Sequence, residues 1–328
     1  MRNIFISDSR TNATTEVIRL KKNKAIIVMA LIVGVALIFA FFTIKKYRDS
    51  NSDSGFSDIG GVYSASSNKV DFSTELTGRL VEGNSSATEG EVSDKSSYPN
   101  DKKRCWGMAR QSNNQTPRAD PGTPELLSKY GAKYLGDVSK KVIYLTFDEG
   151  YENGYTGQIL DTLRDNNVKA AFFITGPYLK EHQDLVRRMV EEGHTVGNHT
   201  IHHPSLPEKS DSQIEEEVVG LERAFTEKFG AKMNFLRPPK GEYSERTLSI
   251  TNKLGYCNLF WSFAYDDWYR GKVRGPEYTY KVVMRNLHNG EIMLLHAVSK
   301  DNADALGMII KGARENGYEF GNVQELAN

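Results

Sequence analysis

The chain has 328 residues, of which 42 are Lys or Arg and 42 are Asp or Glu, so its formal net charge is zero. Balanced charge argues against a nucleic-acid-binding protein, because such proteins normally carry a basic surplus that pairs with phosphates. Two cysteines exclude a disulfide-built scaffold and a cysteine-rich zinc finger. With 39% hydrophobic and 26% charged residues, the composition is that of a globular protein.

The first predicted element is a membrane-spanning helix over residues 25–44. The segment AIIVMALIVGVALIFAFFTI has 20 residues and no charge, and such a helix spans a hydrocarbon core of about 30 Å. A cleaved signal peptide fits less well, because the apolar run is too long and no A-x-A site follows it. Six basic residues precede the segment and three follow it before residue 60. The positive-inside rule therefore places residues 1–24 in the cytoplasm and the rest of the chain outside.

Residues 45–104 are predicted to form a flexible linker. Twelve of residues 51–100 are Ser and six are Gly, a composition that cannot bury enough apolar surface to offset the entropy of ordering. Residues 105–328 are long enough for one domain with its own core. Cys105 and Cys257 are able to pair outside the cell, but two independent, partly buried thiols are the simpler interpretation.

Residues 105–328 are predicted to fold as an α/β domain. Continuous apolar and β-branched runs predict strands, and apolar residues at helical spacing predict helices. Strands are expected at 142–147, 169–175, 195–198, 235–236, 259–262 and 292–295. Helices are expected at 124–133, 158–166, 179–192, 212–229, 244–254 and 278–287. Alternation with short connections favours parallel strands in an α/β barrel or a doubly wound sheet.

Ionisable residues follow five of these strands, at the ends where parallel α/β folds carry their chemistry. They are Asp148 and Glu149, His199 and His203, Arg237, Asp267, and His296. Taken singly, each has an ordinary structural explanation, since an Asp–Glu pair is usually a solvated turn and a lone histidine is usually a satisfied core residue. Their joint placement predicts a single site.

The residue types in this site predict metal-assisted hydrolysis. Two imidazoles and one carboxylate leave positions open at a divalent metal for water and a substrate carbonyl. Asp148 is the candidate base for that water, and His296 is the candidate acid for a leaving amine. Asp267 is expected to hold His296 protonated, and Arg237 is expected to hold Asp148 ionised. The other histidines are interpreted as surface or structural residues: His182, His194, His202 and His288.

Five motifs occur in the order found in the polysaccharide deacetylases, carbohydrate esterase family 4, and the chain resembles that family over about residues 135–325. The motifs are TFDEG at 146–150, HTIHH at 199–203, RPPKG at 237–241, AYDDW at 264–268 and LLH at 294–296. The resemblance implies a distorted (β/α) barrel that holds a divalent metal, most often zinc, with magnesium or manganese as alternatives.

The resemblance also implies a role for each matching residue. Asp148 is the base, His296 the acid, and Arg237 and Asp267 orient them, while Glu149, His199 and His203 hold the metal. The backbone N–H of Lys240 helps to hold the oxyanion, Trp268 forms a groove wall and Leu294 lines the pocket for the acetyl methyl group. Two positions depart from the family pattern. Glu149 stands where the family usually has a second Asp, and Ala264 stands where the fourth motif begins with Asp.

These departures, together with GYENGYT at 150–156 and WSFAYDDW at 261–268, resemble the de-N-acetylases that make muramic-δ-lactam in spore-cortex peptidoglycan. The implied substrate is N-acetylmuramic acid in glycan strands from which an amidase has removed the peptide. One alternative is a vegetative peptidoglycan N-acetylglucosamine deacetylase that confers lysozyme resistance, and another is a wall-binding module whose catalysis Glu149 has impaired. The expected location is the cell membrane, with one span, a cytoplasmic N-terminus and an extracytoplasmic catalytic domain.

Overall fold

The computed structural model describes residues 100–328, apart from residues 112–113, 270 and 328. The predicted membrane helix and all but the last residues of the predicted linker lie outside this described part. Within the described residues, no helix has both the length and the apolar character that a membrane span requires.

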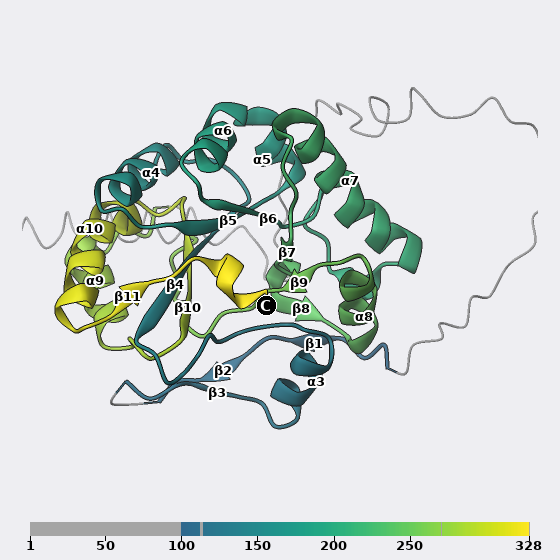
Figure 1. The fold of residues 1–328 in the computed structure, drawn as a ribbon, viewed down its shortest axis with the longest axis horizontal. Coiled ribbons are helices and arrows are strands. Elements are labelled where there is room, and N and C mark those ends of the chain that lie inside the picture. Colours follow the sequence, from purple (N-terminus) through teal and green to yellow (C-terminus); the bar gives the residue numbers. More distant parts are fainter. Residues whose placement is uncertain (1–99, 112–113, 270, 328) are drawn as a thin grey trace, which may run out of the picture. The chain divides into compact units, whose positions relative to one another are not determined.

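The described region is built on a parallel sheet whose strands alternate with helices, which confirms the predicted α/β class (Figure 1). The strand order is β10-β4-β5-β6-β7-β9, and β11 pairs with the start of β4. The strands are β4 (Val142–Glu149), β5 (Ala170–Ile174), β6 (Thr195–Asn198), β7 (Phe235–Leu236), β9 (Cys257–Asn258), β10 (Glu291–His296) and β11 (Glu319–Phe320).

Helices surround the outside of this curled sheet (Figure 1). They are α4 (Thr156–Asp165), α5 (Gly176–Glu181), α6 (Gln183–Glu191), α7 (Asp211–Phe229), α8 (Glu245–Lys253), α9 (Pro276–Met284) and α10 (Lys300–Glu315). Before β4 come β1 (Arg104–Cys105), β2 (Met108–Ala109), β3 (Arg118–Ala119) and α3 (Thr123–Lys129). The remaining short elements are β8 (Glu242–Tyr243), η1 (Leu206–Glu208), η2 (Pro239–Gly241) and η3 (Val323–Leu326).

The sheet curls far enough for the chain after β9 to reach β10. The Ser262 N–H donates to the Ile292 carbonyl at 2.9 Å, and the Leu294 N–H donates to the Phe263 carbonyl at 2.8 Å. The predicted strand at 259–262 is therefore displaced: the regular strand is β9, and the following residues form isolated bridges. The backbone groups of residues 259–263 change partners from β7 to β10 within a few residues, which prevents a continuous ladder of hydrogen bonds.

The inside of the curled sheet is filled by alternate side chains of the strands, as a period of two requires. Tyr144, Phe173, Phe235 and Ile292 belong to one buried cluster, with Ala171, Leu259, Val323 and Leu326. Asp148 and His296 lie an even number of residues beyond Tyr144 and Ile292 on the same strands, and Arg237 lies two residues beyond Phe235, just past the end of β7. The sequence thus places these three polar side chains on the inner side, above the apolar core.

Two further details differ from or refine the expectations. The single helix predicted over 179–192 is two helices, because His182 leaves helical geometry with φ −127° and ψ 45° between α5 and α6. Cys105 and Cys257 both carry free thiols, with Cys105 exposed and Cys257 partly buried. This agrees with two independent thiols, but Cys105 is exposed rather than partly buried as expected.

Candidate active site

Asp148 lies at the inner end of β4, where a buried arginine binds it. Arg237, which follows β7, is fully buried, and its Nη1 donates to Asp148 Oδ1 at 2.8 Å and to Thr146 Oγ1 at 2.9 Å. The Arg237 Nε donates to the Leu259 carbonyl at 3.0 Å, and the guanidinium lies 4.1 Å from the centroid of the Phe173 ring. Two strands, β4 and β5, and the chain after β9 therefore fix this guanidinium against one carboxylate oxygen.

The surroundings of Asp148 keep it ionised. Burial by itself raises the pKa of this carboxyl, but the positive charge of Arg237, the charge of the His296 imidazolium and the Arg237 hydrogen bond outweigh that effect. The pKa of Asp148 therefore lies below its ordinary value. A carboxylate that stays ionised and lies at the rim of the sheet is able to accept a proton. The predicted pairing of Arg237 with Asp148 is present.

His199 and His203 form an adjacent pair of unprotonated imidazoles. The His199 Nδ1 lies 2.9 Å from the Arg237 carbonyl, to which it donates, so its Nε2 is left without a hydrogen and lies 3.6 Å from Asp148 Oδ2. The centroids of the two histidine rings are 4.7 Å apart. Burial is the main cause that lowers the pKa of His199, and it lowers the pKa of His203 to about 3.

A strained turn brings His203 to His199. Thr200 and His203 have φ values of 67° and 57°, in the left-handed region that residues with a Cβ rarely adopt. The Thr200 N–H donates to Asn198 Oδ1 at 2.8 Å, and the His203 N–H donates to Thr200 Oγ1 at 3.0 Å. These side-chain bonds hold the turn in a conformation that local preference does not favour.

Glu149 follows Asp148 on the same strand, but its side chain lies on the opposite side of the sheet. It has the parity of the outward residues Ile143, Leu145 and Phe147. It is fully buried, and neither carboxylate oxygen has a hydrogen-bond partner among the described residues. Its pKa is raised well above the ordinary value, first by burial and then by the negative charges of Glu152 and Asp148.

The two histidines fit a divalent metal, and the side chain of Glu149 lies on the other side of the sheet. Within the described residues, no group of three or more His, Cys, Asp or Glu side chains is arranged to hold a metal ion. His199 and His203 nevertheless have the properties of ligands, because both are unprotonated and the Nδ1–H of His199 is anchored on a backbone carbonyl. The assignment of Glu149 as a third ligand stays a prediction that its placement does not favour.

His296, the last residue of β10, is paired with Asp267. Its Nδ1 donates to Asp267 Oδ1 at 2.7 Å, and its backbone N–H donates to Asp267 Oδ2 at 2.9 Å. Burial lowers the pKa of His296, but the negative charges of Asp267 and Asp148 outweigh burial, so the pKa lies above the ordinary value. The imidazole therefore holds its proton more firmly than a free histidine and is able to act as an acid.

The three predicted substrate contacts lie at different depths. Leu294 is buried, with 3% of its surface exposed, and it is on the same side of β10 as His296. Trp268 is 45% exposed, and its ring centroid lies 5.6 Å from that of His296. Lys240 is exposed in a tight turn with φ 59° and adds positive charge near His203. The structure thus brings Trp268 and Leu294 to the acid and Lys240 to the histidine pair.

Sequence reasoning missed the polar residues behind this site. Asn302, in α10, donates from Nδ2 to Asp267 Oδ2 at 2.6 Å. Thr146 lies two residues before Asp148 on the same side of β4. It accepts a hydrogen bond from Arg237 and donates to the Met293 carbonyl at 2.7 Å. Thr146 lies within the TFDEG motif, so its position was available as a signal. Nothing in the sequence pointed to Asn302, because α10 was not predicted.

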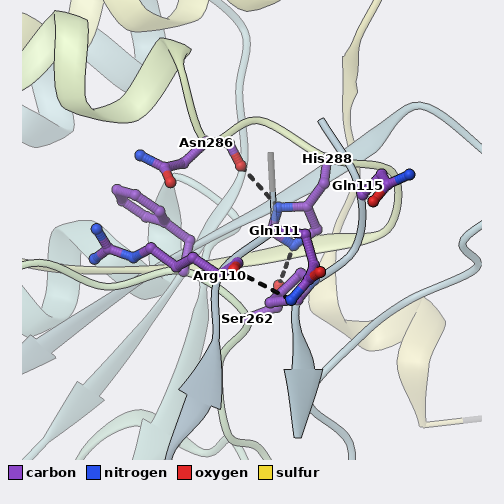
Figure 2. Close-up of a pocket in the computed structure, with 8 residues that line it drawn as sticks. Arg110, Gln111, Gln115, Ser262, Asn286 and His288 are labelled. Carbon is purple, nitrogen blue, oxygen red and sulfur yellow. Dashed lines mark hydrogen bonds between the residues drawn. The ribbon is translucent and has the colours of Figure 1, made fainter. Parts of the chain in front are cut away.

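Another buried histidine, His288, lies near the other end of β10, where its two ring nitrogens have backbone and hydroxyl partners. Figure 2 shows His288 between the Asn286 carbonyl, 2.8 Å from its Nδ1, and the Ser262 hydroxyl, 2.8 Å from its Nε2. The Ser262 oxygen also accepts from the Ile292 N–H at 3.0 Å. The adjoining cavity has a volume of about 10 Å³, room for about one water molecule. His288 is therefore structural, as expected.

Comparison with known proteins connects this geometry to a family. Residues 135–259 match the polysaccharide deacetylase family. The peptidoglycan-N-acetylmuramic acid deacetylase PdaA of Bacillus subtilis is 43% identical over 222 residues, which cover 67% of this chain and 84% of PdaA. An uncharacterized 30.6 kDa protein of Geobacillus stearothermophilus is 49% identical over the same shares of the two chains.

Two further comparisons concern substrate and structure. A peptidoglycan-N-acetylglucosamine deacetylase of Bacillus cereus is 33% identical over 193 residues, 57% of this chain and 89% of that protein. The solved structure of B. subtilis PdaA, a family 4 carbohydrate esterase, matches with a TM-score of 0.67 at 42% identity, over 69% of this chain and 97% of that one. On the evidence of the matched fold and the identity to PdaA, this chain belongs to the polysaccharide deacetylase family, whose members are hydrolases of carbon–nitrogen bonds.

Proposed function

We propose that the protein removes the acetyl group from N-acetylmuramic acid in peptidoglycan and so leads to muramic-δ-lactam in spore cortex. The observation that carries the proposal is the pair of opposite protonation states at one rim of the sheet. Arg237, 2.8 Å from Asp148, lowers the pKa of that carboxyl and favours its ionised form, while Asp267, 2.7 Å from His296, raises the pKa of that imidazole and favours its protonated form. The identity of 43% to a muramic acid deacetylase, against 33% to a glucosamine deacetylase, favours muramic acid as the substrate.

In the proposed reaction, Asp148 accepts a proton from the water that attacks the acetyl carbonyl. A carbon–oxygen bond forms, and the negative charge on the carbonyl oxygen would be held in part by the Lys240 N–H. His296 then gives its Nε2 proton to the amide nitrogen as the carbon–nitrogen bond breaks, which releases acetate and a free amine. Asp267 stabilises the imidazolium before that transfer, and Leu294 and Trp268 would contact the methyl group and the sugar.

The metal in this scheme would be held by His199 and His203. Zinc suits two neutral imidazoles well, with magnesium or manganese as alternatives. When bound, a divalent ion supplies polarisation of the acetyl carbonyl and lowers the pKa of a water molecule. The buried position of His199, with its Nδ1 fixed on the Arg237 carbonyl at 2.9 Å, would keep its Nε2 directed toward the ion.

Lactam formation requires a free lactyl carboxyl next to the new amine. The amine attacks that carboxyl and a water molecule is lost, so the peptide stem must have been removed by an amidase beforehand. We therefore propose that the partner is a peptide-free glycan strand. A protein anchored by residues 25–44, with residues 105–328 outside the membrane, would meet such strands on the wall side.

The decisive experiment treats peptide-free and peptide-bearing glycan strands with the purified full chain and zinc, and measures acetate and the masses of the products. We expect acetate release from muramic acid in peptide-free strands only, and none with Asp148→Asn. Mass analysis of cortex from a deletion strain should show no muramic-δ-lactam, and its persistence would refute the proposal. Deacetylated glucosamine would indicate the lysozyme-resistance alternative, and binding without acetate release would indicate the wall-binding alternative.

A further inference from the structure

A buried chain of hydrogen bonds lies behind the Asp267–His296 pair. Asn302, only 1% exposed, donates from Nδ2 to Asp267 Oδ2 at 2.6 Å and to the His296 carbonyl at 3.0 Å. Its Oδ1 accepts from the Tyr265 hydroxyl, which itself lies 2.9 Å from Thr279 Oγ1. The five residues come from four segments: Thr279 from α9, Asn302 from α10, His296 from β10, and Tyr265 and Asp267 from the loop between β9 and α9.

The partners allow only one orientation of the Asn302 amide. An asparagine side chain has a donor side and an acceptor side. If the amide were reversed, Oδ1 would face the Asp267 carboxylate and the His296 carbonyl, which are both acceptors. The Tyr265 hydroxyl donates to Oδ1, so the same hydroxyl must accept from Thr279. Every proton in the chain therefore points toward Asp267.

We propose that Asn302, oriented by Tyr265 and Thr279, is a positioning residue that holds the Asp267 carboxylate for His296. Two donors, the His296 N–H and the Asn302 amide, occupy Asp267 Oδ2, which leaves Oδ1 for the His296 Nδ1 at 2.7 Å. Without Asn302 the carboxylate loses one of these donors and is free to rotate. The inference rests on the proposed function only in taking His296 as the acid.

The charge balance at His296 gives the direction of the effect. Asp267 and Asp148 favour the imidazolium, and Arg237 opposes it, while His199 and His203 are neutral neighbours. Around Tyr265, Asp267 and Asp301 are negative and Arg274 is positive. Since Asn302 holds the Asp267 carboxylate turned toward His296, its loss weakens the strongest support of the His296 imidazolium.

The test follows the His296 imidazole by NMR titration of the full chain labelled at histidine Cε1, with His296→Gln assigning the signal. We expect Asn302→Leu to lower the His296 pKa by about one unit, the usual scale of environmental shifts. The alkaline limb of kcat should move in the same direction, with kcat about 10–100-fold lower, as for other supporting hydrogen bonds. KM should stay nearly constant, because Asn302 does not reach substrate.

Two variants keep the test decisive. Tyr265→Phe preserves shape while removing the hydroxyl that orients Asn302, so it should lower the same pKa by a smaller amount, and it serves where Asn302→Leu does not fold. Asn258→Leu removes an equally buried amide that bonds Thr251 in α8, and it should leave His296 unchanged. An unshifted His296 in both site variants would overturn the inference. Absence of acetate release by the wild type would instead refute the proposed function, since the NMR titration needs no substrate.

Discussion

Asp148 and Glu149 are neighbours in the chain, yet the pleat of β4 gives them different chemistry. Asp148 faces inward to Arg237 at 2.8 Å and has a lowered pKa. Glu149 faces the helices, where Glu152 is nearby and Thr156 opposes the effect of burial only weakly, so its pKa is raised. A buried carboxyl without a donor is most stable when neutral. Adjacent acids therefore take different charge states, and only Asp148 is suited to be the base.

The placement of Glu149 predicts that its charge is dispensable for metal binding. Glu149→Gln has nearly the same shape as the neutral acid, so we expect the dissociation constant for zinc to change by less than about tenfold. His199→Ala should weaken zinc binding by at least about 100-fold, because it removes a direct ligand. Calorimetric titration of the metal-free full chain measures both values, with His182→Ala as a control histidine. Equal weakening by the Gln and His199 variants would establish Glu149 as a ligand.

Arg237 is predicted to be essential for stability at neutral pH. Arg237→Met leaves the Asp148 carboxylate buried and unpaired, which should cost about 3–5 kcal/mol in the free energy of unfolding. The lowered pKa of Asp148 means that the pair contributes stability above the ordinary carboxyl pKa and loses it as pH falls through the lowered folded pKa.

Denaturant unfolding of this variant checks both the size and the pH dependence. The deficit of Arg237→Met should be large at pH 7 and should shrink in acid, and adding Asp148→Asn should restore part of the lost stability. A deficit that is independent of pH and unchanged by Asp148→Asn would mean that packing around Phe173, rather than charge, accounts for the role of Arg237.

At the scale of elements, the sequence was most informative where the local pattern is strong. The predicted strands at 195–198 and 235–236 match β6 and β7, because buried parallel strands are short apolar runs between turn residues. The catalytic motifs could be located for the same reason, since each follows a strand. Helix α10 was not predicted, and it carries Gly307 and Gly312, which disfavour helix. A Cβ at Gly312 would lie 2.7 Å from the Tyr280 hydroxyl in α9, so tertiary packing selects glycine there.

The same limit explains why the site was only partly predictable. Asp148, His199, Arg237 and His296 were found from their order in the sequence, and Asn302 was not, because its role depends on a contact between α10 and the distant loop that carries Asp267. The alternation of side chains along β4 already places Glu149 on the opposite side of the strand from Asp148. The family motif nevertheless led to its assignment as a metal ligand. Contacts between distant elements are the information that a single sequence carries least directly.

Packing between β5 and β6 is predicted to control the position of Arg237 and so its pairing with Asp148. An added Cβ at Gly197 would lie 2.5 Å from the Phe173 ring, on which Arg237 stacks. Gly197→Ala should therefore destabilise the protein by about 1–3 kcal/mol through overpacking, and it should lower kcat by displacing Arg237. Gly157→Ala, on α4 with open space around it, should instead add about 0.5–1 kcal/mol. Thermal unfolding and acetate release would measure both; a neutral Gly197→Ala would contradict the packing argument.

At the scale of the whole molecule, the zero net charge conceals an asymmetry. The first 44 residues contain six basic and two acidic residues, so the other 284 carry a net charge of −4. In the proposed topology the outward part is slightly acidic and gains no general electrostatic attraction to an anionic wall polymer. Affinity for glycan strands would then arise at the site around His296, and the basic residues would orient the chain in the membrane.

That orientation gives the last prediction. If the six basic residues before residue 25 hold the N-terminus inside, proteinase K added to intact protoplasts should remove a C-terminal epitope and leave an N-terminal epitope on a short protected fragment. Detergent lysis should expose both. Replacing Lys21, Lys22 and Lys24 by Asn equalises the basic residues on the two sides, so it should yield a mixture of orientations, because acidic and neutral residues contribute little to the rule. A C-terminal epitope protected in the wild type would place the catalytic domain on the cytoplasmic side, away from glycan strands, and would refute both the anchor's orientation and the proposed access to substrate.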